Sequence, residues 1–174
     1  MPAPEADRQR FRAVMGHFPT GVAVVTARDE QGAVGLTTNA LTSLSLDPLL
    51  ILVCFDNASR TLPVVRATER FAVNVLRAGQ EHLAGRFASK LPLEEKFGDV
   101  PHHDEAGVPI LAGALAWIAC DLRELLPGGD HTIGIGAVTA MDHDEGEPLV
   151  WHRGAYTALR THSTGAPPGS PAPR

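Results

Sequence analysis

The sequence contains little cysteine, fewer basic than acidic residues, and no long apolar run. Two cysteines, Cys54 and Cys120, lie in separate apolar segments of the 174 residues, so we expect two buried, reduced thiols and no disulfide. Lys and Arg total 15 against 20 Asp and Glu, a net charge of −5, which argues against a nucleic-acid partner. No apolar run approaches the roughly 18–20 residues of a membrane helix, so we expect no membrane partner. The opening residues, MPAPEADRQR, lack the apolar core of a signal peptide, and we therefore expect a cytoplasmic protein.

Several catalytic and nucleotide-binding motifs are also missing. No serine lies in a nucleophile elbow, and neither cysteine has basic neighbours, so a nucleophilic triad fits poorly. No Walker loop is present, and Gly134 and Gly136 fall within a strand pattern instead of opening a helix as a dinucleotide fingerprint does. His102, His103 and Asp104 are adjacent, but neighbouring side chains of an extended segment point apart, so we predict no metal site.

What the sequence does contain is a series of short strand patterns separated by turn residues, in a chain long enough for one domain with a real core. The patterns predict strands at residues 21–27, 33–38, 41–46, 49–55, 71–76, 115–125, 132–141 and 149–152. The run 49–55 is apolar throughout, which predicts burial on both faces, and glycines interrupt 132–141, which predicts a bulge or bend. Strands outnumber helices, so we expect a mainly β fold, a β-barrel with peripheral helices.

Three segments have helical patterns. The first places Phe11, Val14, Met15 and Phe18 at helical spacing, with Asp7 as its cap and Pro19 at its end. The second is a short helix capped by Ser59 or Asn57, and the third spans residues 79–88. We expect residues 89–109 to be mostly loop, with a short turn at 93–97. The Pro-, Gly- and Ser-rich segment 161–174 has little to bury and is predicted to be a disordered tail beside a single domain at 8–160.

Two polar clusters flank the apolar strand 49–55. Thr37, Thr38 and Asn39 precede it and offer hydrogen-bonding groups with little bulk. Asn57, Ser59, Arg60 and Thr61 follow it with hydroxyls, an amide and a guanidinium beside the start of a helix, a set that suits a phosphate. The clusters could hold the two ends of one long amphipathic ligand.

Other polar residues have both a functional and a plain structural interpretation. Arg86, Ser89, Lys90 and Lys96 form a basic, hydroxyl-bearing patch that suits a phosphate or pyrophosphate, and they are equally consistent with a solvated helix end. His131 opens a strand after a turn, where it can stand at a barrel rim or serve as an ordinary turn histidine. Tyr156, the single tyrosine, can cover a flat ring or plug the barrel end.

Six segments occur together in an order typical of one family. They are FPTGVAVVTA (18–27), the stretch 35–61, FAVNVL (71–76), RFASK followed by EKF (86–90 and 95–97), GDH (129–131) and WHRGAYTAL (151–159). Over about residues 8–160 the chain resembles the short-chain flavin reductases, the reductase components of two-component flavin-dependent monooxygenases. The resemblance implies an FMN-binding, Greek-key-like split β-barrel that forms a homodimer. It also implies that NADH or NADPH reduces FMN or FAD, and that reduced flavin diffuses to a separate monooxygenase.

The same resemblance implies a role for each matching position. Thr37, Thr38, Asn39 and Ala40 would line the flavin ring, and Phe55, Asn57, Ser59, Arg60 and Thr61 would hold the ribityl chain and phosphate. Ser89, Lys90 and Phe97 would close over the phosphate end. His131 would act catalytically by meeting the nicotinamide, and Tyr156 would be the aromatic residue after the last strand. Hydride transfer between two cofactors needs no protein nucleophile, which agrees with the missing triad.

Two other functions stay open at this point. One is a split-barrel flavoprotein that keeps its FMN tightly bound and acts on a substrate of its own. The other is a non-catalytic module that binds flavin or haem. A protein that keeps its yellow colour through dialysis would favour the first, and one that consumes no NADH with added flavin would favour the second.

Overall fold

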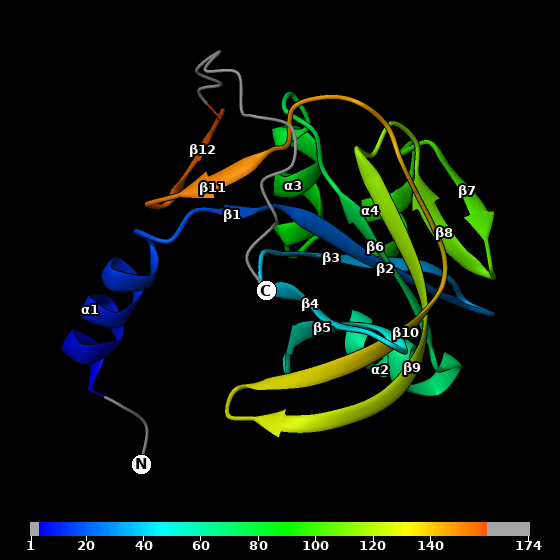
Figure 1. Ribbon diagram of the computed structural model, residues 1–174, viewed down its shortest axis with the longest axis horizontal. Coiled ribbons are helices and arrows are strands. Elements are labelled where there is room, and N and C mark those ends of the chain that lie inside the picture. The colour runs from blue at the N-terminus through cyan, green and yellow to red at the C-terminus, as the bar shows by residue number, and fades with distance from the viewer. Residues whose placement is uncertain (1–3, 160–174) are drawn as a thin grey trace.

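The computed structural model describes residues 4–159, and within them the chain is mainly β with helices at the periphery (Figure 1). The predicted tail at 161–174 lies outside the described residues. The helices are α1 (Glu5–Met15), α2 (Thr61–Thr68), α3 (Glu81–Ala88) and α4 (Leu93–Phe97). The strands are β1 (Thr20–Gly21), β2 (Ala23–Asp29), β3 (Gly32–Thr38), β4 (Leu41–Leu46), β5 (Leu49–Asp56), β6 (Arg70–Val75), β7 (His102–Glu105), β8 (Val108–Leu111), β9 (Ala116–Gly128), β10 (His131–His143), β11 (Val150–His152) and β12 (Ala155–Thr157).

The largest sheet must curl into a barrel because its two edge strands are joined by only two residues. Its order is β3-β2-β6-β9-β10-β5-β4, so β3 and β4 lie at opposite edges, yet Asn39 and Ala40 alone connect them. In a flat sheet seven strands wide the edges would be about 29 Å apart. The chain from Thr38 to Leu41 spans at most about 11 Å. The sheet therefore curls round until its edge strands β3 and β4 come near each other (Figure 1). These two strands are not paired in the sheet order, so the barrel has an open seam between them, as the predicted split barrel requires.

The barrel core packs two phenylalanines against two glycines. Phe55 and Phe71 are fully buried and meet edge to face, with ring centroids 5.9 Å apart. A Cβ atom at Gly134 would stand 2.7 Å from Phe55, and one at Gly136 would stand 2.5 Å from Phe71. The register of β9 with β10 shifts between Ile135 and Gly136 and again further along, which confirms the predicted bulge. The two glycines are therefore required by close packing.

The prediction that strand 49–55 is buried on both faces is wrong for the chain by itself. Burial alternates along β5, with Ile51, Val53 and Phe55 in the core. Leu52 and Cys54, which alternate with them, are only half-buried and line a groove that also contains residues of α1. The outward side chains of Leu52 and Cys54 are apolar, and the described part of the chain leaves both only half-covered.

The segment 89–109 is also more ordered than predicted. It contains α4 and the strand β7, which pairs with β8 in an antiparallel hairpin. All four residues of β8 are buried. The buried side chain of Asn74 accepts a hydrogen bond from the Leu111 N–H at 2.8 Å and donates to Thr26 at 3.0 Å, which ties the hairpin to the barrel. The proline and glycine of this stretch give it a composition typical of a loop. The hairpin forms because hydrogen bonds to the barrel hold it in place.

Helix α1 begins earlier than predicted and is not packed on the barrel. It starts at Glu5 after Pro4, so Asp7 lies in its first turn and does not cap it. No residue of α1 is buried, and Phe11 and Val14 are 66% and 63% exposed. Phe18, just beyond the helix, is 69% exposed. Figure 1 shows α1 standing to one side of the barrel.

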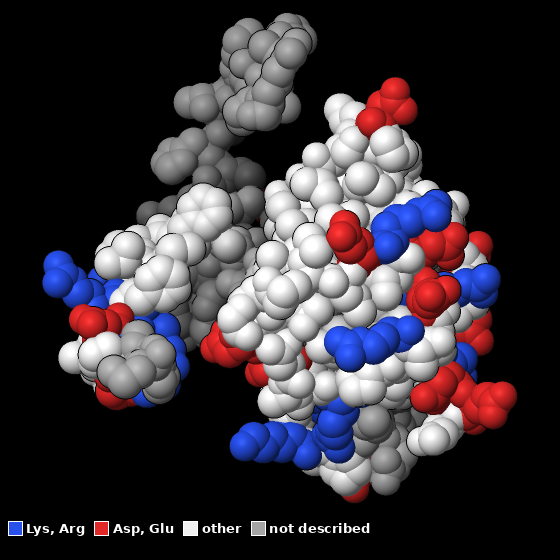
Figure 2. Space-filling model, turned by 90° about the horizontal axis from the view of Figure 1, so that it is seen from below, with Lys and Arg blue, Asp and Glu red and all other residues white. Residues whose placement is uncertain are grey.

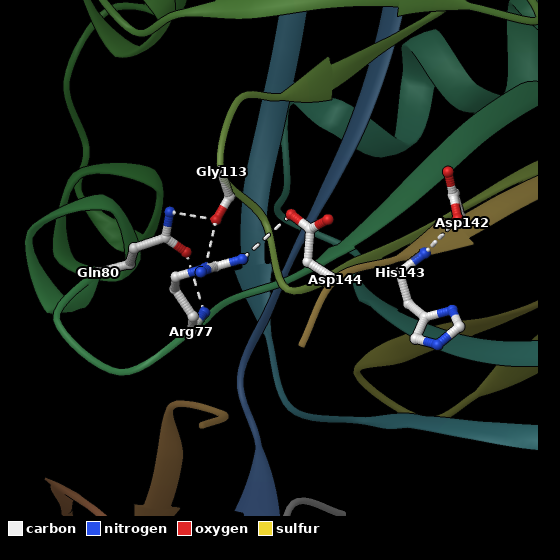
Figure 3. A network of polar contacts seen from close by, with 6 residues as sticks. All are labelled: Arg77, Gln80, Gly113, Asp142, His143 and Asp144. Atoms are coloured by element: carbon white, nitrogen blue, oxygen red, sulfur yellow. Dashed lines mark hydrogen bonds and ion pairs between the residues drawn. The ribbon is translucent and has the colours of Figure 1, made fainter. Parts of the chain in front are cut away.

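A polar network fixes the end of the barrel near the β6–α3 connection. Arg77 donates from Nε to the Gly113 carbonyl at 2.9 Å and pairs through its second terminal nitrogen with Asp144 at 3.2 Å. The Gln80 side chain donates to the same carbonyl at 3.0 Å and accepts from the Arg77 N–H (Figure 3). The close-up also shows Asp142 accepting from the backbone N–H of His143. These bonds hold together the segments that precede α3, β9 and β11.

The surface carries charges of both signs. On the face shown in Figure 2, Lys and Arg lie interspersed with Asp and Glu. Among the described residues, no helix is long and apolar enough to cross a membrane.

Candidate functional site

A pocket of about 540 Å³ opens beside the barrel seam, and we call it the polar pocket. One wall comes from β3 and a second from the turn between β5 and α2. The third comes from the end of α3 and from α4. The lining residues are Gly35, Leu36, Thr37, Asp56, Ala58, Ser59, Arg60, Thr61, Phe87, Ala88, Ser89, Lys90 and Lys96. Six of the predicted site residues are therefore brought together here: Thr37, Ser59, Arg60, Thr61, Ser89 and Lys90.

The start of α2 presents backbone and hydroxyl groups to this pocket. Asp56 accepts a hydrogen bond from the Ala58 N–H at 2.8 Å, and the Ser59 hydroxyl accepts one from the Thr61 N–H at 3.0 Å. The N-cap position is Arg60, without a side-chain cap, so Ser59 acts one residue earlier than a conventional cap. The N-terminus of a helix carries a partial positive charge, which suits an anion at this wall.

Three cations and one carboxylate line the polar pocket. Arg60 and Lys90 are exposed, and Asp56 is the carboxylate. Arg60 donates to the Leu91 carbonyl. Lys96 is only 6% exposed, and its Nζ donates to the Phe87 carbonyl at 2.9 Å. Burial, followed by the like charge of Arg60, holds the pKa of Lys96 below its ordinary value.

Arg86, part of the basic patch seen in the sequence, binds α4 and does not line the pocket. It donates to the Glu95 carbonyl at 2.6 Å and pairs with Asp99 at 2.7 Å. The hydrogen bond from Arg86 lowers the pKa of Asp99. Arg86 and Lys96 thus fasten α3 and α4 together, and the third wall of the polar pocket is fixed.

A second pocket, of about 270 Å³, adjoins the first, and we call it the aromatic pocket. It is lined by Val22, Thr37, Thr38, Asn39, Ala88, Trp151 and Tyr156. Trp151 and Tyr156 face each other across the β11–β12 hairpin, with ring centroids 4.9 Å apart. Because Thr37 and Ala88 line both pockets, the two pockets adjoin and together present an aromatic end and a cationic end.

The predicted ring-binding residues occupy the seam itself. Thr37 donates to the Ala84 carbonyl at 2.7 Å, and Asn39 donates from its amide to the Thr20 hydroxyl at 3.0 Å. The Ala40 N–H donates to the Thr38 hydroxyl at 3.1 Å, so this N–H is already engaged. Ala40 lines the groove beside α1 instead of the aromatic pocket.

Asn57 and His131 lie together at the turn of the β9–β10 hairpin. Asn57 donates to the Gly129 carbonyl at 3.2 Å and accepts from the Thr132 hydroxyl at 2.7 Å, so its amide fixes the hairpin. His131 stands opposite Asp56 in the β-ladder and donates from Nδ1 to Asp130 at 2.8 Å. That hydrogen bond lowers the pKa of Asp130. His131 lines neither the polar nor the aromatic pocket, and Figure 1 shows its hairpin turn far from β12, which carries Tyr156.

The side chains of two predicted site residues point elsewhere. Phe55 is fully buried in the barrel core, so its ring cannot touch a ligand in either pocket. Phe97 is 6% exposed and packs on Phe87 and His102, where it faces a separate cavity on the other side of α4. The family resemblance implied a ligand contact for both. The alternation of β5 and the winding of α4 turn both rings away.

Lys96 and Trp151 line the site, although neither is among the site residues predicted from the sequence. Lys96 belonged to a basic patch, but nothing in the sequence showed that its side chain would be the buried one. Trp151 lies in a segment that carries the resemblance, and its pairing with Tyr156 depends on the β11–β12 register. The sequence has an aromatic residue on each side of a two-residue turn, Arg153-Gly154, and this pattern predicts that Trp151 pairs with Tyr156.

The donors in this site fit the flavin that the sequence suggests. Hydroxyls, cations and a helix N-terminus at one end suit a phosphate. Two aromatic rings and small side chains at the other end suit a flat heterocycle. Within residues 4–159 no group of three His, Cys, Asp or Glu side chains lies close enough to hold a metal ion.

Comparisons with known proteins agree with this geometry. A family model described as "Flavin reductase like domain" matches residues 15–160. The chain is 36% identical over 164 residues to the reductase subunit HsaB of a flavin-dependent monooxygenase from Mycobacterium tuberculosis, covering 92% of this chain and 87% of that protein.

Two solved structures share the fold. One is nitrilotriacetate monooxygenase component B from Mycobacterium thermoresistibile, with a TM-score of 0.89 and 34% identity, covering 98% of this chain and 95% of that one. The other is the NADH:FAD oxidoreductase SgcE6 of Streptomyces globisporus in complex with NAD and FAD fragments. Its TM-score is 0.83 at 35% identity, covering 95% of this chain and 99% of that one.

Proposed function

The chain belongs to the flavin reductase-like family, and on that basis we propose that it uses NADH or NADPH to reduce FMN or FAD for a partner monooxygenase. The observation that carries the proposal is the junction of the two pockets at Thr37 and Ala88. It gives one site with an aromatic end for a ring and a cationic end for a phosphate. A flavin bound there would supply the chemistry by accepting a hydride at its ring.

The residues of the chain hold and orient the ligands. Trp151 and Tyr156 flank the ring with Thr38 and Asn39 on the seam. Ser59, Thr61, Ser89 and the cations of the polar pocket hold the phosphate. The hydrogen bond from Thr37 to Ala84 keeps β3 against α3, so the two halves of the site keep a fixed separation. Orientation of this kind raises the rate because the reactants meet already aligned.

His131 is proposed to contact the nicotinamide nucleotide, not the flavin. Asp130 accepts the Nδ1 proton of His131, which leaves Nε2 to face a ligand as an acceptor while the ring is neutral. Because His131 stands beside Asp56 of the polar pocket but outside both pockets, a contact there would change nucleotide binding more than flavin binding.

We further propose that the chain acts as a homodimer. The exposed apolar side chains of α1 and Phe18 lie beside an apolar groove of about 680 Å³ that Leu52, Cys54 and Trp151 help to line. A second copy of the chain would cover both the helix and the outward face of β5. A contiguous exposed apolar surface of this kind marks an interaction site. Trp151 lines the aromatic pocket as well, so the proposed interface would adjoin the ring end of the site.

The flavin is proposed to be a diffusible substrate, and the compartment is proposed to be the cytoplasm. Arg60 and Lys90 are exposed, and solvent screens exposed charges, so they hold a phosphate only moderately. The two free thiols, Cys54 and Cys120, suit a reducing compartment.

Loss of absorbance at the NADH band tests the function when FMN, FAD and riboflavin are added in turn. We expect oxidation that depends on added flavin, with a protein that loses its flavin on dialysis. A lack of oxidation with all three flavins would overturn the proposal.

A further inference from the structure

We propose that a separate pocket beside α4 binds a small neutral phenol, and that the bound phenol tightens flavin binding. This pocket has a volume of about 370 Å³ and lies on the opposite side of α4 from the polar pocket, and we call it the α4 pocket. Its residues come from the β2–β3 hairpin, α2, α4 and the start of β7. The effect on flavin rests on the proposed function, whereas the binding of the phenol does not.

The wall of the α4 pocket is apolar and well packed. Val34, Val64 and Phe97 line it, and all three are buried. Phe97 meets His102 edge to face, with ring centroids 5.1 Å apart. Aliphatic and aromatic side chains of this kind suit a flat ring, and the volume lies at the lower end of the range for small-molecule sites. We therefore expect a ligand of one or two aromatic rings.

Two polar residues that line the α4 pocket, Arg28 and Asp29, keep unused hydrogen-bonding capacity. Arg28 donates from one terminal nitrogen to Nε2 of His102 at 3.1 Å, and its Nε lies 3.3 Å from Asp104 without hydrogen-bond geometry. Its other terminal nitrogen forms no hydrogen bond within the described residues. One oxygen of Asp29 accepts from the Gln31 N–H at 2.9 Å, and the second oxygen has no partner among the same residues. The pocket therefore offers one free donor group and one free acceptor.

The charges of the lining favour a neutral ligand over an ion. Arg28 is the one cation and Asp29 the one carboxylate of this lining, since His102 accepts from Arg28 and is therefore neutral. A carboxylate ligand would gain a contact with Arg28 but would also face Asp29, and like charges placed together are unfavourable. A phenol hydroxyl can donate to Asp29 and accept from Arg28 at the same time. A phenol therefore matches both polar residues, and an aromatic acid matches only one.

The α4 pocket shares two elements with the polar pocket. Along β3, residues 32–34 line the α4 pocket and residues 35–37 line the polar pocket. On α4, Phe97 faces one pocket and Lys96 the other, and the rings of Phe97 and Phe87 are 5.1 Å apart. A phenol packed on Phe97 would hold α4 in place as a wall of the polar pocket. It should therefore favour flavin binding, and flavin should favour phenol binding by the same factor.

The first test is a calorimetric titration of the whole chain, without flavin, with 2-naphthol and then with 2-naphthoate. The two compounds share a ring system, but near pH 7 the phenol is neutral and the acid is an anion. We expect one saturable site for naphthol and at least about tenfold weaker binding of naphthoate. An absence of saturable naphthol binding, or equal affinity for the two compounds, would overturn the inference.

The variant Asp29→Asn tests the acceptor, because asparagine keeps an oxygen for the Gln31 N–H and loses the charge. We expect naphthol to bind about fivefold more weakly and naphthoate at least about threefold more tightly. Glu30→Gln is the matched control: it removes the same charge from an exposed neighbour outside the lining, and it should change neither affinity. Equal weakening of both compounds by Asp29→Asn would indicate a structural role and would overturn the inference. If Asp29→Asn does not fold, the two wild-type titrations still decide.

The coupling is measured as the affinity for FMN, by quenching of flavin fluorescence, with and without saturating 2-naphthol. We expect FMN to bind at least about fivefold more tightly when naphthol is present. Weaker binding would mean that naphthol occupies the flavin site, and an unchanged affinity would mean that the pockets are not coupled; either result overturns the inference. Naphthol that tightens FMN binding in a chain without NADH oxidation would overturn only the proposed function. NADH oxidation by a chain that does not bind naphthol would overturn only this inference.

Discussion

The hydroxyl of Thr37 donates a hydrogen bond of 2.7 Å to the carbonyl oxygen of Ala84. This contact joins β3, at the barrel seam, to α3, whose end forms a wall of the polar pocket. Thr37 lines both halves of the site, so the contact sets their relative position.

Replacing Thr37 with valine should therefore loosen the site as well as lower stability. Valine keeps the shape and removes the hydroxyl, so we expect the free energy of unfolding to fall by about 1 kcal/mol and flavin to bind more weakly. Thr42→Val is the control, because the Thr42 hydroxyl is exposed and, among the residues that the structure describes, bonds only its neighbour Ser43. Urea unfolding and flavin titration check both effects, and equal losses in the two variants would contradict the account.

The glycines of β10 should be intolerant of a side chain. A Cβ at Gly136 would stand 2.5 Å from Phe71 and 2.9 Å from Cys120, so Gly136→Ala should destabilise the chain by about 1–3 kcal/mol. In contrast, no other part of the described chain lies within 4 Å of the Cβ position of Gly85 in α3, apart from the backbone of the helix itself and the neighbouring residues. Gly85→Ala should stabilise by about 0.5–1 kcal/mol through helix propensity. Thermal unfolding should move the two melting temperatures in opposite directions, and a fall in both would count against this assignment.

The apolar face of α1 should be required for dimer formation. We expect a mass near twice the 18.5 kDa of one chain by light scattering. Phe11→Asp places a charge on the helix and should weaken the dimer at least about tenfold. Met141→Asp is the control, because Met141 is 60% exposed on β10, away from α1. A monomeric wild-type chain, or a dimer insensitive to Phe11→Asp, would contradict the proposal.

His131→Ala should act on the nicotinamide nucleotide. Loss of one hydrogen bond predicts a rise of about two- to tenfold in the KM for NADH or NADPH, with flavin affinity nearly unchanged. His143→Ala, at the far end of the same strand, should change neither value. Steady-state kinetics with each substrate varied separately makes the comparison, and an unchanged KM for the nucleotide would remove His131 from the site.

Cys120 should be unreactive in the folded chain. Burial raises the pKa of the Cys120 thiol to about 12, above the 9.0 of a free thiol. At pH 8 the thiolate fraction is then about one in ten thousand, so a thiol reagent should label Cys120 only after unfolding.

The raised pKa of Cys120 also makes stability depend on pH. Because the folded-state pKa is the higher one, the contribution of the buried, protonated thiol to stability is complete below about pH 9 and declines as the pH rises toward 12. Cys120→Ala should flatten that decline in alkaline unfolding curves, and rapid native labelling of Cys120 would show that the thiol is not buried.

Much of this architecture was predictable from local patterns, and the rest depends on tertiary contacts. Alternating and β-branched runs located β2, β3, β4 and β6, and glycine spacing predicted the bulged β10. The β7–β8 hairpin was missed because Pro109 and Gly107 give it the composition of a loop, while Asn74 supplies the distant hydrogen bond that orders it.

The functional site also has features that the sequence predicts and features that depend on tertiary contacts. The polar clusters around Thr37 and Ser59 were recognisable because residue type alone indicates what they can bind. Which of Lys90 and Lys96 is buried depends on how α4 lies against α3, and no local pattern contains that information. The rings of Phe55 and Phe97 point away from both pockets, and the sequence did not indicate this, because ring direction depends on the alternation of β5 and on the packing of α4.

The central claim is that this chain passes hydride from a nicotinamide nucleotide to a flavin held at the barrel seam. An anaerobic titration measures that transfer directly, with FMN, a catalytic amount of the chain and stepwise additions of NADH. The account predicts that the flavin absorbance bleaches at one NADH per flavin, and that bleaching slows in the Thr37→Val variant. If the absorbance of both FMN and FAD persists when wild-type chain is given NADH and then NADPH, that result would contradict it.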